Sequence, residues 1–117
     1  MSTNSHSVTE HFEKSEPQVR AIYAAILTAA RKWGSVTEDP KKTSIHLVRK
    51  TAFAGIATRK AALILTLKSD SDIRSERIAK REQASAHRWH LEVKLEKPQQ
   101  VNRELIRWLE KAYQMSG

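Results

Sequence analysis

Two histidines three residues apart stand out in the stretch SAHRWHLEVKLE, which covers residues 85–96. His87 and His90 flank Arg88 and Trp89, and side chains of these types can bind a metal ion, transfer a proton or contact a phosphate. From Trp89 onward, apolar residues occupy the odd positions and polar residues the even ones. This period of two predicts a β-strand, in which residues three apart point to opposite faces of the sheet.

The strand geometry argues against a shared metal ion or a histidine-based catalytic pair. Rings on opposite faces do not reach one zinc ion, and the chain has neither cysteine nor an HExxH motif. We expect His87 to be partly buried at the strand start and His90 to lie on the exposed face. Only three glycines are present, which excludes a P-loop, and no serine stands in a GxSxG turn. The sequence predicts no catalytic residue, cofactor or metal ligand, and favours a protein that is not an enzyme.

A basic surface is the feature that the composition favours. The net charge is +8 at pH 7, and residues 41–97 hold fourteen Lys and Arg against six Asp and Glu. An excess confined to one segment is typical of proteins with an anionic partner. The candidate anion-binding residues on the predicted sheet and its turns are His46, Lys50, Arg59, Lys60, Arg88, His90 and Lys94. Further cations lie on the adjoining segment, at Arg74, Arg77, Lys80 and Arg81.

The large aromatic residues limit the kind of contact that this surface makes. Phe53 and Trp89 share the parity of the apolar positions, so we expect them in the core rather than exposed for base stacking. We expect Trp108 on the core-facing stripe of the final helix, and Tyr113 off that stripe and half exposed. The leading prediction is therefore a small binding module whose basic sheet contacts an anionic partner, either the phosphate backbone of a nucleic acid or an acidic protein.

Two alternatives stay open from the residues alone. The first is a protein-interaction or homodimerisation domain, since an exposed edge of an antiparallel sheet can pair with another strand. The second is a small-molecule or enzymatic pocket, for which His46, Arg59 and His90 are the best candidates.

Local patterns predict an α+β domain that positions these residues. Ser7 and Glu10 form a capping box ahead of a short helix. Two longer segments carry apolar residues at helical spacing, and between them the period changes to two. We expect an antiparallel sheet of about four or five strands with the helices packed on one face. The expected strands are 44–50, 52–58, 61–67, 76–84 (which a short helix would also fit) and 87–96; the expected long helices are 17–33 and 99–115, and 34–43 is expected to be a loop.

The whole chain suits one domain in a reducing compartment. Its 117 residues are enough for a single core, which we place at residues 8–115 after a disordered tail at 1–7. The absence of cysteine and of a signal-peptide pattern predicts a cytoplasmic protein. The longest apolar run, AALILTL at 61–67, is too short to cross a bilayer, so no membrane contact is expected.

Four segments resemble the DUF5655 family of small bacterial domains: VRAIYAAIL, FAGIATRKAALILTL, RWHLEVKL and VNRELIRWLEKAYQ. The most specific piece is the ending EL-x-x-WL-x-x-AY, which is matched by Glu104, Leu105, Trp108, Leu109, Ala112 and Tyr113. The family often carries Asp at the start of this helix, where this chain has Gln100 and Asn102. The resemblance covers residues 8 to 115 and implies an α+β fold but no activity. Family members fused to other domains imply an accessory binding role.

Overall fold

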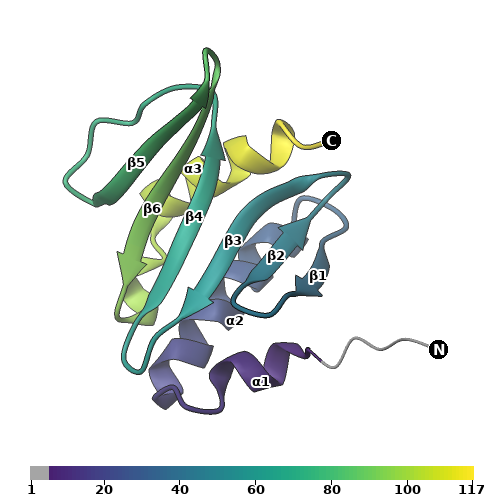
Figure 1. Ribbon diagram of the computed structural model, residues 1–117, viewed down its shortest axis with the longest axis vertical. Coiled ribbons are helices and arrows are strands. Elements are labelled where there is room, and N and C mark those ends of the chain that lie inside the picture. The colour runs from purple at the N-terminus through teal and green to yellow at the C-terminus, as the bar shows by residue number, and fades with distance from the viewer. Residues whose placement is uncertain (1–5) are drawn as a thin grey trace.

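The computed structural model describes residues 6–117, and residues 1–5 of the expected tail lie outside this range. The helices are α1 (Val8–Phe12), α2 (Pro17–Arg31) and α3 (Arg103–Gln114). The strands are β1 (Thr37–Pro40), β2 (Ile45–Val48), β3 (Ala52–Thr58), β4 (Leu63–Ser69), β5 (Ile78–Ser85) and β6 (Arg88–Leu95). They form one antiparallel sheet in the order β1-β2-β3-β4-β6-β5, and α2 and α3 pack behind it in the view of Figure 1. The predicted α+β fold is confirmed.

The structure has six strands rather than four or five, because the segment expected to be a loop contains β1. Pro40 is tolerated there because it ends a four-residue edge strand, where its missing amide breaks no inner ladder. Glu38 fixes β1 to α2 by accepting hydrogen bonds from the Tyr23 hydroxyl at 2.6 Å and from Arg31 at 3.1 Å. The predicted strand at 76–84 is confirmed as β5, and the predicted capping box of Ser7 and Glu10 begins α1.

The core lies between the inner face of the sheet and the apolar stripes of α2 and α3. Alternate residues of β2, β4 and β6 are buried, as the period of two predicts. Tyr113, which we expected to be half exposed, is only 2% exposed. Its ring packs edge-on against Phe53 at 5.2 Å, and its hydroxyl donates to the Ser35 carbonyl at 3.1 Å. This tyrosine belongs to the core because the buried face of α3 is wider than the apolar spacing predicted.

A β-bulge in β3 shapes the sheet. Leu47 of β2 pairs with Ala54, but the next residue of β2 pairs with Ala52, so Phe53 is an extra residue on β3. The side chains of Phe53 and Ala54 are consequently both buried. Pairing between β3 and β4 begins only at Ala54 and Leu67. The two strands therefore diverge beyond this pair, as Figure 1 shows at the upper ends of β3 and β4.

The C-terminal end of α3 supports the diverging strands from behind. The Arg49 guanidinium lies over the Tyr113 ring at 4.5 Å and donates to the Tyr113 carbonyl at 3.2 Å. The Ser116 carbonyl accepts from the amides of Lys50 and Thr51 at 3.1 and 3.2 Å. These contacts fix the turn between β2 and β3 to the end of the chain.

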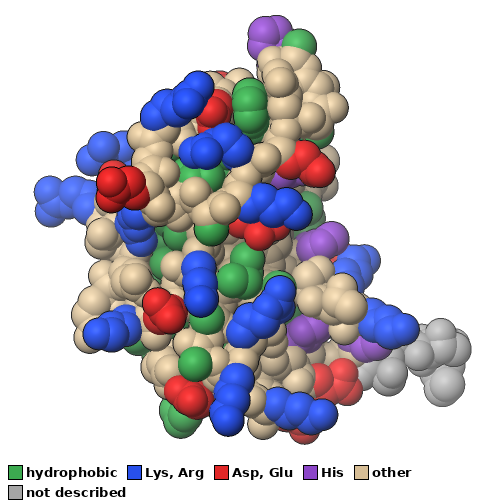
Figure 2. All heavy atoms as spheres, turned by 60° about the vertical axis from the view of Figure 1, so that its left-hand side comes forward, with side chains coloured by type: hydrophobic (Ala, Val, Ile, Leu, Met, Phe, Trp, Pro, Cys, Tyr) green, Lys and Arg blue, Asp and Glu red, His purple; other side chains and the backbone are tan. Residues whose placement is uncertain are grey.

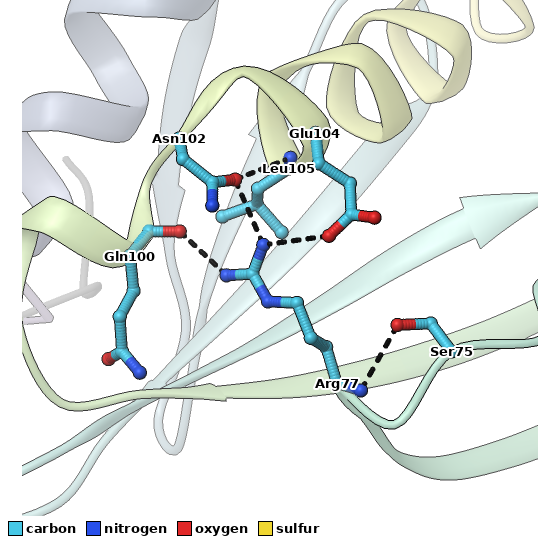
Figure 3. Close-up of polar contacts among 6 residues, drawn as sticks. All are labelled: Ser75, Arg77, Gln100, Asn102, Glu104 and Leu105. Atoms are coloured by element: carbon cyan, nitrogen blue, oxygen red, sulfur yellow. Dashed lines mark hydrogen bonds and ion pairs between the residues drawn. The ribbon is translucent and has the colours of Figure 1, made fainter.

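A second set of contacts fixes the long connection between β4 and β5 to the start of α3 (Figure 3). The Arg77 guanidinium donates to the Gln100 carbonyl at 2.6 Å, to Asn102 Oδ1 at 2.9 Å and to Glu104 Oε1 at 3.3 Å. Asn102 Oδ1 also accepts from the Leu105 amide at 3.1 Å and so caps α3. One arginine thus pairs with the carboxylate of Glu104 in the first turn of the helix and anchors the connection that precedes β5.

The same connection binds two more cations. Asp72 accepts from Arg74 at 3.3 Å and from Arg81 at 2.8 Å. Together with Arg77, three of the four cations that we predicted on this segment therefore form ion pairs within the chain. No helix of the described chain is long and apolar enough to span a bilayer.

We predict that Arg77→Met lowers the free energy of unfolding by about 1–3 kcal/mol, because it removes charge-assisted hydrogen bonds from a side chain that is only 23% exposed. Arg74→Met is the matched control, since that side chain is 88% exposed and its loss should change stability by less than about 0.5 kcal/mol. Urea denaturation of both variants measures the difference. Equal effects would contradict the role assigned to Arg77.

Candidate functional site

The outer face of the sheet, opposite the helices, carries a hollow of about 320 Å³ where β3 and β4 diverge. We call it the notch. Its floor is formed by β3, and one wall carries a side chain of β2 while the other carries side chains of β4 and β6. The residues that line it include His46, Ala52, Gly55, Ala57, Lys68 and His90.

Lys68 is the most unusual residue of the notch. Its amine donates to Thr51 Oγ1 at 3.1 Å and to Ser116 Oγ at 2.9 Å, and it has no carboxylate partner within residues 6–117. Burial lowers the pKa of Lys68, and the positive charge of Arg88 lowers it further. A cation that has lost water but faces only neutral hydroxyls is one that an anion would stabilise.

Two more cationic or titratable side chains lie near this amine. Arg88 begins β6 and, within the described chain, has no acidic partner. His90 lies directly opposite Lys68 in the pairing of β4 with β6. Glu82 of β5 brings an opposing charge, because its Oε1 lies 3.8 Å from His90 Nδ1 and its side chain is 69% exposed. Lys68 and Arg88 are the two cations that we place at this end of the notch.

The floor of the notch is formed by small residues. Ala52, Gly55 and Ala57 line the hollow from β3. Gly55 does not have the positive φ that would require glycine. A Cβ added there would meet Thr66 Cβ at 3.7 Å, which is ordinary van der Waals contact. Neither backbone conformation nor crowding therefore requires glycine at this position, although glycine inside a strand costs roughly 0.5–1 kcal/mol relative to alanine.

The predicted binding residues do not form one surface. His46 and His90 line the notch, and Arg88 lies beside its cationic end. Lys50 lies in the turn between β2 and β3, near the same end of the sheet but outside the lining. Lys94 pairs with Ile64, four residues before Lys68, which places it about 13 Å away along β4.

Arg59 and Lys60 lie in the turn between β3 and β4, at the other end of the sheet. They line a second hollow of about 630 Å³ beside α1, together with Glu10 and Glu13. The pocket that we expected near His46, Arg59 and His90 thus contains the two histidines and lacks the arginine.

Sequence reasoning missed Lys68, Thr51 and Ser116. The alternation of β4 does place Lys68 on the outer face, because Leu67 is buried, so the pattern of that strand contained the signal. No sequence pattern indicated that the hydroxyls of Thr51 and Ser116 would reach this amine. Thr51 stands in a turn, and Ser116 reaches the site only because the C-terminal end of α3 packs under that turn.

The structure separates His87 from His90. His87 is exposed in the turn between β5 and β6, so the expectation that it is partly buried was wrong, because β6 begins one residue later at Arg88. His90 lies on the outer face, as expected. Residues 6–117 contain no group of three or more His, Cys, Asp or Glu side chains placed to hold a metal ion.

Cationic side chains are spread over the side of the molecule that Figure 2 presents, and acidic side chains lie between them. The ion pairs of Arg74, Arg77 and Arg81 account for part of this mixture. The cations of this side are thus spread out, and several of them are paired with acidic side chains.

We predict a pH dependence that comes from Lys68. Because its folded-state pKa lies below the 10.5 of an ordinary lysine, the unfolded chain binds more protons in the interval between the two values. Charged Lys68 therefore destabilises the folded state at neutral pH, and this effect is relieved as pH rises toward 10.5. From pH 7 to pH 10, the free energy of unfolding of the native protein should rise relative to that of Lys68→Met.

Urea denaturation at each pH measures this difference, with the exposed Lys94→Met as a control for the loss of one positive charge. A difference between native protein and Lys68→Met that stays constant with pH would show that Lys68 is not desolvated.

A family model described as a domain of unknown function, DUF5655, matches residues 8–116, nearly the whole chain. The resemblance that we drew from four sequence segments is thereby confirmed. No curated protein and no solved structure matches the chain. The chain belongs to the DUF5655 family.

Proposed function

We propose that this protein is a non-enzymatic binding module that receives an anionic group in the notch. The observation that carries the proposal is the position of Lys68, a partly buried cation held by two hydroxyls at the edge of a hollow. Arg88 and His90 add positive or titratable groups at the same end. The cytoplasmic location that the cysteine-free composition predicts belongs to the same proposal.

An anion would complete the hydrogen bonding of Lys68. A lysine ammonium has three N–H donors, and two of them go to Thr51 and Ser116. The third has no partner within residues 6–117 and is available to a ligand oxygen. A charge-assisted hydrogen bond in a partly desolvated site is stronger than the same contact at an open surface.

The charge distribution favours one local anionic group over a long polyanion. A nucleic acid gains affinity from many phosphate contacts along a basic stripe. Here Arg77 and Arg81 form ion pairs within the chain, and Lys94 lies about 13 Å from Lys68 along the sheet. Contact with nucleic acid remains a prediction of the sequence, and titration with an oligonucleotide distinguishes it from binding of a single anionic group.

Homodimerisation also remains a prediction of the sequence, and the free edge of β5 does not favour it. Lys80, Arg81 and Glu82 follow one another in the middle of this edge strand. Charged side chains on an edge discourage pairing with another strand. Arg81 also binds Asp72 and the Ile73 carbonyl, so the connection before β5 lies against it.

We expect inorganic phosphate, followed by amide chemical shifts, to perturb residues 66–69 and 88–91. Lys68→Met should weaken this binding about 10-fold or more, because a hydrogen bond to a charged group contributes about 1.5–3 kcal/mol. Lys94→Met is the matched control and should change the affinity less than about 2-fold.

The same titration with a single-stranded DNA oligonucleotide tests the polyanion. Equal weakening by Lys68→Met and Lys94→Met, with a steep salt dependence, would indicate binding spread over the face and would overturn the proposal of a local site.

A further inference from the structure

We propose that the ligand of the notch is a small molecule that combines a flat ring with an anionic substituent. The ring lies over Gly55 and the anionic group binds Lys68. This inference rests on the anion site proposed above and adds the class of the ligand.

The floor of the notch gives the first argument. The side chains that β3 presents to the hollow are no larger than a methyl group, at Ala52, Gly55 and Ala57. The neighbouring strands carry larger outward side chains in register with Gly55, namely His46 of β2 and Thr66 of β4, and both line the notch. The floor is thus a strip of bare backbone and methyl groups between taller walls.

Gly55 gives the second argument. Its φ is not positive and a Cβ would fit, so neither fold nor packing explains a residue that weakens a strand. A glycine inside a strand often marks close approach of a ligand or of another backbone to the strand. Within residues 6–117 no other segment lies over this face at the notch, so the strip around Gly55 is open to a ligand.

The two ends of the notch give the third argument. The hollow of about 320 Å³ lies at the lower limit for small-molecule sites, roughly 300–1,000 Å³. Lys68 and His90 supply polar groups on one side, His46 lies on β2, and the floor between them is apolar. Such sites bind compact molecules with an apolar body and a few fixed polar groups. A flat ring matches the bare strip, and an anionic substituent matches Lys68.

Two kinds of small molecule share this chemistry, an aromatic carboxylate and a mononucleotide. The experiment titrates the full chain, followed by amide shifts, with benzoate, with cyclohexanecarboxylate, with AMP and with inorganic phosphate. Benzoate and cyclohexanecarboxylate have the same charge and ring size and differ in flatness. AMP and phosphate differ by the nucleoside. Tighter binding of benzoate than of cyclohexanecarboxylate indicates an aromatic carboxylate as the ligand. Tighter binding of AMP than of phosphate indicates a mononucleotide.

The variants separate the ring from the anion. Gly55→Val fills the floor, and we expect it to weaken the flat ligand about 10-fold or more while phosphate affinity changes less than about 2-fold. Lys68→Met should weaken both ligands about 10-fold. Ala79→Val places the same side chain at an exposed position of β5 and should change neither. If Gly55→Val does not fold, Gly55→Ala should still weaken the flat ligand about 2- to 5-fold.

Three results would overturn the inference. One is equal binding within each pair of probes, so that flatness and the nucleoside add nothing. Another is unchanged affinity for the flat ligand in the folded Gly55 variants. Both leave the anion site standing if phosphate binding still depends on Lys68. The third is that no probe binds, phosphate included, and this result removes the proposed function together with the ligand class.

Discussion

The β-bulge at Phe53 is the constraint on which the site depends. The extra residue bends β3 away from β4 and turns the phenylalanine ring into the core, where it packs against Tyr113. The gap that opens on the outer face is closed from behind by the end of α3, through Ser116. The register shift lies between β2 and β3, and the pairing of β3 with β4 ends at Ala54 and Leu67. Lys68 follows Leu67 and lines the notch at this end.

Arg77 and Lys68 are both partly buried cations, but their hydrogen-bond partners differ. Arg77 is met by two carbonyl oxygens and by the carboxylate of Glu104, and it holds the connection before β5 to the start of α3. Lys68 is met only by hydroxyls, and burial and a neighbouring arginine disfavour its charge. The first arrangement stabilises the folded chain by itself. The second has no carboxylate partner within residues 6–117, and the anion that we propose as a ligand would supply one.

The sequence predicts the layers of this fold better than it predicts the site. Alternation identified β6 and the outward position of His90, because side-chain direction in a strand follows from position alone. The expected burial of Phe53 is confirmed, whereas helical spacing failed at Tyr113, whose burial depends on its tertiary contact with Phe53. Charge counting identified a basic segment but not its ion pairs, since the contacts of Asp72 and Glu104 with these arginines depend on how the chain folds. The DUF5655 resemblance, now confirmed, implied the fold and no activity.

The central claim is that Lys68 is a desolvated cation that an anion stabilises. The most direct measurement is the titration of the Lys68 side-chain amine by NMR, in the free protein and with saturating phosphate. The account predicts a pKa below 10.5 in the free protein, because burial and Arg88 disfavour the charged form, and a rise of that pKa when phosphate binds. A free-protein value of 10.5 that phosphate leaves unchanged would contradict it.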